Sequence, residues 1–124
     1  MISRSTVYIV DDDTAVRSAI SLLVSSCGWS PRPFSSAEEF LQGYERDKAA
    51  CLILDLQMPG MKGVDLQDIF TDLDIVLPVI VVTAYKDHPM AERAKLAGAR
   101  AVIAKPFREE ELVNHIRGAL SEVS

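Results

Sequence analysis

Apolar residues follow two alternating patterns along this chain. Short runs rich in β-branched and aromatic residues are typical of strands, and apolar residues spaced three and four apart are typical of helices. The strand pattern occurs at residues 6–10, 29–34, 51–55, 78–82 and 101–104. Helical patterns follow these runs, with apolar positions within residues 16–27, 40–44, 64–73, 89–97 and 112–120. The chain therefore predicts five strands alternating with five helices.

Local signals mark where several of these helices begin and end. Asp13 is placed as the N-cap of the first helix, and Gly28 as its stop. Ser36 and Glu39 fit a capping box, in which the hydroxyl and the carboxylate satisfy two backbone donors. Gly98 ends the fourth helix. These signals agree with the hydrophobic pattern.

The composition of the strands predicts their order. Residues 51–55 are apolar up to Asp55, which indicates a strand buried on both faces of a parallel sheet. Pro31 and Pro33 are tolerated only in an edge strand, so residues 29–34 are placed at an edge. Alternating strands and helices with right-handed crossovers predict an α/β fold, a doubly wound five-stranded parallel sheet of order 2-1-3-4-5, flavodoxin-like. We expect one domain over residues 1–124.

Composition narrows the class of protein. Hydrophobic residues make up 48% of the 124 residues and charged residues 25%, as in an ordinary soluble domain. The stretch 75–82 is far shorter than the roughly 18 residues of a spanning helix, and the N-terminal residues lack a signal-peptide pattern. We therefore expect a cytoplasmic protein without membrane contact. The net charge of −5 argues against direct contact with nucleic acid, which needs clustered Lys and Arg.

Cys27 and Cys51 are the two cysteines, and they have neither zinc-site spacing nor the density of a disulfide framework. We interpret them as buried free thiols, because cysteine is among the most buried residue types.

Polar side chains that are able to take part in catalysis or binding lie where the strands end. Asp11 and Asp12 follow the first strand, and Asp55 ends the third. Thr83 and Lys105 follow the fourth and fifth strands. The carboxyl ends of parallel strands meet at one edge, where ligands bind, and the switch point of the sheet lies between strands one and three. We expect these five residues to share one site.

The three carboxylates define the chemistry of this site. At about 4 Å, two such charges repel each other by about 1 to 4 kcal/mol in a screened environment, and a divalent cation removes that cost. Oxygen ligands without His or Cys, in a site that awaits a phosphate, favour Mg²⁺. A carboxylate beside Mg²⁺, with a Lys ammonium and a Thr hydroxyl at the same point, can attack a phosphoryl group and hold its oxygens. The product would be an aspartyl phosphate.

The position of each of these residues also has a purely structural explanation. Asp11 to Asp13 can form a solvated turn and a helix cap, Asp55 and Thr83 can end strands, and Lys105 can be a surface cation. Their coincidence at four strand ends favours a common site.

The motifs resemble those of the receiver domain of two-component response regulators, over essentially the whole chain. They are Val10-Asp11-Asp12, Asp55 with Met58-Pro59-Gly60 and Gly63, Thr83-Ala84, Ala97-Gly98-Ala99 and Lys105-Pro106-Phe107. A second pattern, Asp12-Asp13-x-Ala15-Val16-Arg17 with Ser36-Ala37-Glu38-Glu39-Phe40-Leu41, is similar to FixJ-like receivers. Such receivers usually precede a helix-turn-helix domain. The resemblance implies phosphorylation by a histidine kinase and regulation of transcription through an attached domain.

The resemblance also implies a role for each site residue. Asp55 would be the phosphoacceptor, in a signalling domain that promotes its own phosphorylation and dephosphorylation and is not an enzyme. Asp12, Asp55 and the main-chain carbonyl of Gln57 would bind Mg²⁺, with Asp11 assisting through water.

Two further residues complete the implied site. Thr83 and Lys105 would contact the phosphoryl group. The peptide bond between Lys105 and Pro106 would be cis, which proline makes feasible.

Other functions fit part of the pattern. Phosphatases of the haloacid dehalogenase type also use a strand-end Asp with Mg²⁺, but they place a second acid two residues on, where this chain has Gln57. The chain contains neither of the two glycine-rich motifs that are typical of nucleotide-binding sites. A receiver acting alone, as a phosphorelay shuttle or protein-contact switch, fits the same residues as one with an output domain.

Val102 departs from the family pattern. Receivers commonly carry Tyr or Phe three residues before the strand-five lysine. Valine has one restricted χ angle and cannot swing between a buried and an exposed position. We therefore predict that the signal leaves through residues 83–85 and the fourth helix. Phosphorylation would then form a homodimer through that helix and the fifth strand, with small residues at Ala101 and Ala104.

Overall fold

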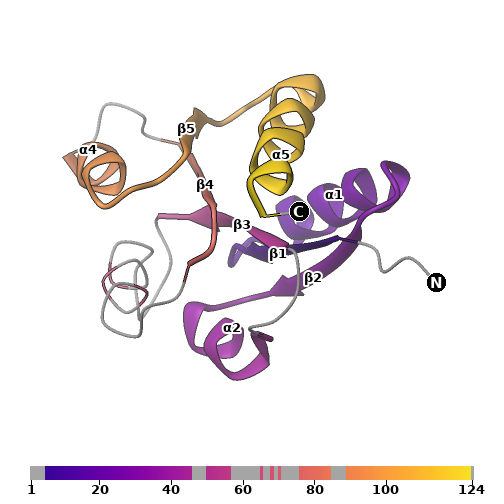
Figure 1. Ribbon diagram of the computed structural model, residues 1–124, viewed down its shortest axis with the longest axis horizontal. Helices are drawn as coiled ribbons and strands as arrows, with labels where there is room; N and C mark the ends of the chain where they lie inside the picture. The colour runs from indigo at the N-terminus through magenta and orange to yellow at the C-terminus, as the bar shows by residue number, and fades with distance from the viewer. Residues whose placement is uncertain are drawn as a thin grey trace.

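The computed structural model describes residues 5–45, 50–56, 65, 68, 70, 76–84 and 89–123. Strands and helices alternate along the chain (Figure 1), in the order β1 Thr6–Val10, α1 Thr14–Ser26, β2 Ser30–Phe34, α2 Ala37–Gly43, β3 Ala50–Asp55, β4 Val79–Thr83, α4 Pro89–Leu96, β5 Ala101–Ala104 and α5 Glu109–Val123. Between β3 and β4, the described residues Asp65, Asp68 and Phe70 are helical, within the stretch where the sequence predicts the third helix.

The five strands form one parallel sheet of order β2-β1-β3-β4-β5, as the sequence predicts. Val10 pairs with Phe34 on one side and Leu54 on the other, and Thr83 pairs with Ala104. This register brings the carboxyl ends of neighbouring strands to the same edge of the sheet. β2, with its two prolines, lies at the outer edge next to β1.

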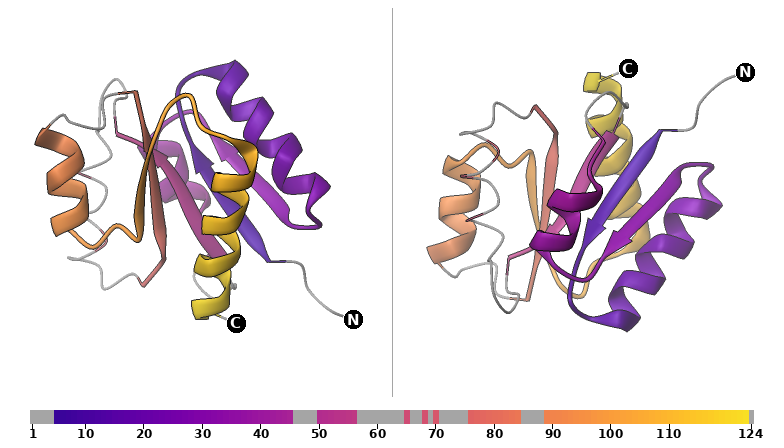
Figure 2. Two further views of the ribbon diagram at one scale, coloured as in Figure 1. Left: turned by 90° about the horizontal axis from the view of Figure 1, so that it is seen from above. Right: turned by 90° about the horizontal axis from the view of Figure 1, so that it is seen from below.

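Helices cover both faces of the sheet. Figure 2 shows α1 and α5 on one face and α2 and α4 on the other. The cluster under α1 and α5 contains Ile20, Val24, Leu112 and Ile116 packed against strand residues Val7, Ile9, Ile53 and Ile80. The cluster under α2 and α4 contains Phe40, Ala91 and Ala94 packed against Tyr8, Leu52 and Val81. Burial on both faces explains why β1, β3 and β4 are apolar almost throughout.

The predicted ends of α1 and α4 agree with the structure. The Asp13 carboxylate accepts hydrogen bonds from the N–H groups of Ala15 at 2.9 Å and Val16 at 3.2 Å, so Asp13 is the N-cap of α1. Gly28 and Gly98 have φ of 86° and 102°, a left-handed conformation that glycine adopts without strain.

The capping box of α2 differs in one detail from the expected pattern. Ser36 Oγ accepts a hydrogen bond from Glu39 N–H at 3.1 Å, as expected. The Glu39 carboxylate, however, accepts from the N–H and the hydroxyl of Ser35, at 3.0 and 2.8 Å. These two bonds from Ser35 lower the pKa of Glu39. Two backbone donors are satisfied as predicted, but the second belongs to Ser35.

Some predicted features lie outside the described residues. They are Gln57, the 58–60 and Gly63 positions, and Tyr85. Among the helices that the structure does describe, none combines the length and the apolar character needed to cross a membrane.

Candidate functional site

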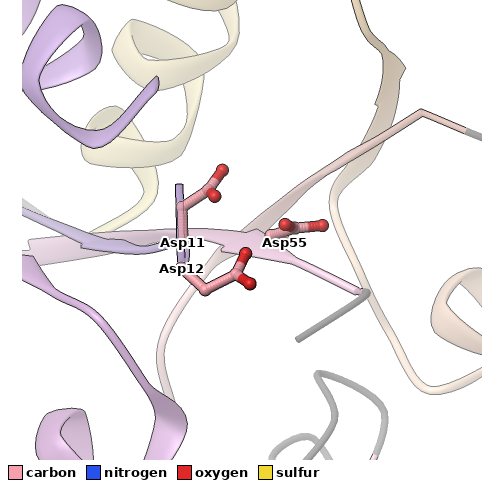
Figure 3. A group of neighbouring side chains, drawn as sticks. All are labelled: Asp11, Asp12 and Asp55. Carbon is pink, nitrogen blue, oxygen red and sulfur yellow. The ribbon is translucent and has the colours of Figure 1, made fainter. Parts of the chain in front are cut away.

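Three carboxylates gather at the carboxyl edge of the sheet. Asp11 and Asp12 follow β1, and Asp55 is the last residue of β3, the strand next to it (Figure 3). One oxygen from each side chain lies within 4.8 Å of the other two. Asp11 and Asp55 are buried, whereas Asp12 is exposed. The topology therefore brings together, from positions 44 residues apart in the chain, the acids that the sequence places in one site.

Lys105 completes this cluster from the end of β5. Its ammonium is 3.0 Å from Asp11 Oδ2 and 3.5 Å from Asp55 Oδ2. Burial alone would lower the pKa of Lys105, but the hydrogen bond to Asp11 and the attraction of Asp55 outweigh it and raise the pKa above its usual value. Lys105 is therefore a cation at neutral pH. The peptide bond between Lys105 and Pro106 is cis, as expected.

Asp11 is bonded at each of its polar groups. Its carboxylate accepts from Lys105 Nζ at 3.0 Å and from Asp13 N–H at 2.9 Å. Its main-chain N–H donates to the Phe34 carbonyl at 3.3 Å, and its own carbonyl accepts from Arg17 Nη1 at 2.7 Å. Each carboxylate oxygen of Asp11 accepts one hydrogen bond and keeps a second lone pair for a metal ion or a water molecule.

The donor set fits a hard divalent cation. Asp11, Asp12 and Asp55 carry three negative charges, and the Lys105 ammonium offsets one of them. Carboxylate oxygens are the ligands that Mg²⁺ prefers, and the exposure of Asp12 leaves room for the waters that this ion retains. Gln57, the further predicted ligand, lies outside the described residues.

Thr83 is the last residue of β4 and is buried. Asp55 pairs with Val82 in the sheet register, so Thr83 is one position further toward the carboxyl edge. Its carbonyl accepts a hydrogen bond from Lys105 N–H at 2.8 Å, which ties the end of β4 to the start of the segment after β5. The main chains of Thr83 and Lys105 are thus fixed to each other beside the carboxylates.

Comparison with known families matches residues 7–117 to the response regulator receiver domain. The chain belongs to the response regulator receiver family. The matched segment of this receiver includes Asp11, Asp12, Asp55, Thr83 and Lys105.

Relatives of this receiver are named as response regulator and transcriptional regulatory proteins. It is 48% identical over 116 residues to the response regulator protein TodT of Pseudomonas putida, and 39% identical over 114 residues to the transcriptional regulatory protein FixJ of Rhizobium meliloti. These alignments cover 94% and 92% of the receiver but 51% and 56% of the two relatives. The chain therefore spans about half the length of the curated relatives it matches.

Solved structures agree with this assignment. The receiver superposes on the FixJ-N crystal structure with a TM-score of 0.90 and 36% identity, covering 99% of this chain and 98% of that one. It superposes on the response regulator StyR with a TM-score of 0.91 and 37% identity, covering 98% of this chain and 61% of that one. The flavodoxin-like fold and the similarity to FixJ-like receivers are both confirmed.

Sequence reasoning missed two contacts of the site. The bond from Asp13 N–H to the Asp11 carboxylate is an Asx-turn, and the Asp-Asp-Asp run was the signal for it. The bond from Arg17 to the Asp11 carbonyl has no comparable signal, since a flexible arginine in this position can reach several acids.

Proposed function

We propose that this receiver accepts a phosphoryl group on Asp55 from the phosphohistidine of a histidine kinase, in a reaction that depends on Mg²⁺. The observation that carries the proposal is the meeting of the Asp55 carboxylate, two further acids and the Lys105 ammonium at one edge of the sheet. Family membership supports the same class of reaction.

Asp55 would act as the nucleophile. One carboxylate oxygen forms a bond to phosphorus while the bond from phosphorus to the histidine nitrogen breaks, and the electron pair of that bond stays on the imidazole. Asp55 is held at the end of a buried strand, which fixes the direction of its side chain for attack.

Asp12 and Asp55, with the main-chain carbonyl of Gln57, would hold the Mg²⁺, and Asp11 would contact it through water. When bound, the ion supplies positive charge to the phosphoryl oxygens during transfer. Asp11 stays available for this indirect role because each of its carboxylate oxygens, which accept from Asp13 N–H and Lys105 Nζ, keeps a second lone pair for a water molecule.

Lys105 and Thr83 would bind the transferred phosphoryl group. The Lys105 ammonium, now shared by Asp11 and Asp55, can move to a phosphoryl oxygen on Asp55 with little displacement. The Thr83 hydroxyl would donate to another oxygen, which draws the end of β4 toward Asp55 and moves the segment that leads to α4.

We infer that this movement promotes the formation of a homodimer through α4 and β5. Val102 is half-buried against the cluster under α4 and has no aromatic ring to reorient. Leu96 on α4 is 81% exposed, which provides apolar surface for a second copy. The equilibrium needs to shift by only a few kcal/mol to populate the active form.

We propose that the chain is the receiver part of a cytoplasmic transcriptional regulator. The chain spans about half of relatives such as TodT and FixJ, the second of which is named a transcriptional regulatory protein. DNA contact is assigned to an attached helix-turn-helix domain, because the receiver carries a net charge of −5.

The experiment that tests the proposed function is incubation with acetyl phosphate, followed by intact mass spectrometry. We expect the addition of one phosphoryl group in the presence of Mg²⁺ and none after chelation. Addition that continues unchanged after chelation would contradict the proposal.

A further inference from the structure

Arg17 contacts the acidic cluster from α1, and none of the roles above uses it. Its guanidinium turns back toward the start of the helix, where Nη1 donates to the main-chain carbonyl of Asp11 at 2.7 Å and Nη2 to Thr14 Oγ1 at 3.4 Å. The Arg17 side chain is half-buried. The shorter bond has the length of a charge-assisted hydrogen bond.

Arg17 occupies an unfavourable place for a cation. Its N–H donates to the carbonyl of Asp13, the N-cap, at 2.9 Å, so Arg17 closes the first turn of α1. The helix dipole is positive at this end and opposes a positive side chain there. The hydrogen bonds of the guanidinium to Asp11 and Thr14, and its attraction to the Glu39 carboxylate, act against this cost.

The carbonyl that Arg17 holds belongs to the peptide unit between Asp11 and Asp12. On the other side of Asp11, the N–H bond to the Phe34 carbonyl is long, at 3.3 Å. At 2.7 Å, the hydrogen bond from Arg17 is the shorter of these two bonds to the main chain of Asp11. Rotation of the peptide would move the exposed Asp12 carboxylate away from Asp55.

We propose that Arg17 is a positioning residue for the magnesium site. By holding the peptide between Asp11 and Asp12, it keeps the Asp12 carboxylate within bonding range of a cation that Asp55 also binds. This inference rests on the proposed function, because it requires Mg²⁺ at the acidic cluster.

If Arg17 positions a metal ligand, its replacement should change Mg²⁺ affinity in the opposite direction from the change expected if Arg17 acts only through its charge. A nearby positive charge repels a metal cation, so its removal alone would tighten Mg²⁺ binding. Loss of a residue that orients a metal ligand weakens binding instead, by about 10- to 100-fold in known metal sites. The sign of the change therefore separates the two roles.

The test is calorimetric titration of Mg²⁺ into the wild-type chain, Arg17→Met and Arg17→Gln. Met keeps the aliphatic stem without a donor, and Gln keeps polarity but is too short to reach the Asp11 carbonyl. Arg117→Met is the matched control, because it removes the same charge from an exposed position on α5. Thermal unfolding without Mg²⁺ is measured for each variant.

We expect both Arg17 variants to bind Mg²⁺ about tenfold more weakly than the wild type, and Arg117→Met to stay within about twofold. If Arg17→Met does not fold, Arg17→Gln gives the same comparison. Unchanged or tighter binding in a folded Arg17 variant would overturn the positioning role while leaving the proposed function intact. Failure of the wild-type chain to bind Mg²⁺ would overturn both.

Discussion

The ammonium of Lys105 lies between two carboxylates, 3.0 Å from Asp11 Oδ2 and 3.5 Å from Asp55 Oδ2. Lys105 reaches them because β5 ends at the same edge of the sheet as β1 and β3. If Mg²⁺ binds as proposed, this ammonium would compete with the ion for the Asp55 carboxylate before phosphorylation. If Asp55 is phosphorylated as proposed, the ammonium would already lie beside the new phosphoryl oxygens.

Replacement of Lys105 by Met should tighten Mg²⁺ binding by at least about threefold, because one competing cation leaves the site. The same change should abolish dimerisation induced by phosphorylation. Calorimetric titration checks the first effect, with Lys95→Met on α4 as a control that removes an equal charge outside the site. Weaker binding in Lys105→Met would show that the ammonium supports the metal site instead of competing with it.

Replacement of Asp12 by Ala should weaken Mg²⁺ binding by tenfold or more, since loss of a direct ligand forfeits at least about 1.4 kcal/mol. Asp13→Ala is the matched control. Asp13 caps α1 and lies outside the carboxylate group, so its loss should lower the unfolding free energy by about 1 kcal/mol and leave Mg²⁺ affinity within about threefold. An unchanged titration for Asp12→Ala would remove Asp12 from the site.

Thr83 and Val102 should differ in their importance for the switch. Beryllofluoride mimics the phosphoryl group on Asp55 and should convert the wild type and Val102→Ala to dimers, but not Thr83→Ala. Sedimentation velocity with and without beryllofluoride measures this directly. If Thr83→Ala dimerises fully while Val102→Ala stays monomeric, the signal passes through Val102 and the proposed route is wrong.

Cys27 and Cys51 should differ in reactivity. Burial raises the pKa of the Cys51 thiol to about 12, whereas Cys27 is half-buried at the end of α1. Iodoacetamide at pH 8 should therefore alkylate Cys27 alone in the folded protein and both cysteines in denaturant. Peptide mass mapping checks the assignment, and rapid alkylation of Cys51 in the folded chain would contradict its burial.

The same thiol should contribute to stability at alkaline pH. The folded pKa of Cys51 lies above the unfolded value of about 8.5, so its contribution is fully present below pH 8.5 and is lost as pH rises toward 12. Urea unfolding of the wild type should show a decline in this range that is smaller in Cys51→Ala. An equal decline in both would assign the effect to other groups.

The sequence predicts those features that depend on local pattern. The five strands, the edge position forced by Pro31 and Pro33, and the Asp13 cap all follow from residue types and spacing. The meeting of Asp11 with Lys105 also follows, because strand ends in a parallel sheet share an edge.

Such patterns do not predict which partner a flexible side chain contacts. The bond of the Glu39 carboxylate to Ser35 and the bond of Arg17 to the Asp11 carbonyl depend on the backbone conformation at the starts of α2 and α1. Several partners at similar distances compete for each of these flexible side chains. Only the folded backbone decides between them.

The identity of the phosphoacceptor is the central claim, and chemical mapping tests it most directly. Borohydride reduces an aspartyl phosphate to homoserine, so the chain is treated with acetyl phosphate and Mg²⁺, reduced, digested and sequenced by mass spectrometry. We predict homoserine at position 55 in the wild type and no modified residue in Asp55→Asn. Homoserine at Asp11 or Asp12 in the wild type, or an undiminished phosphoryl adduct in Asp55→Asn, would contradict the account.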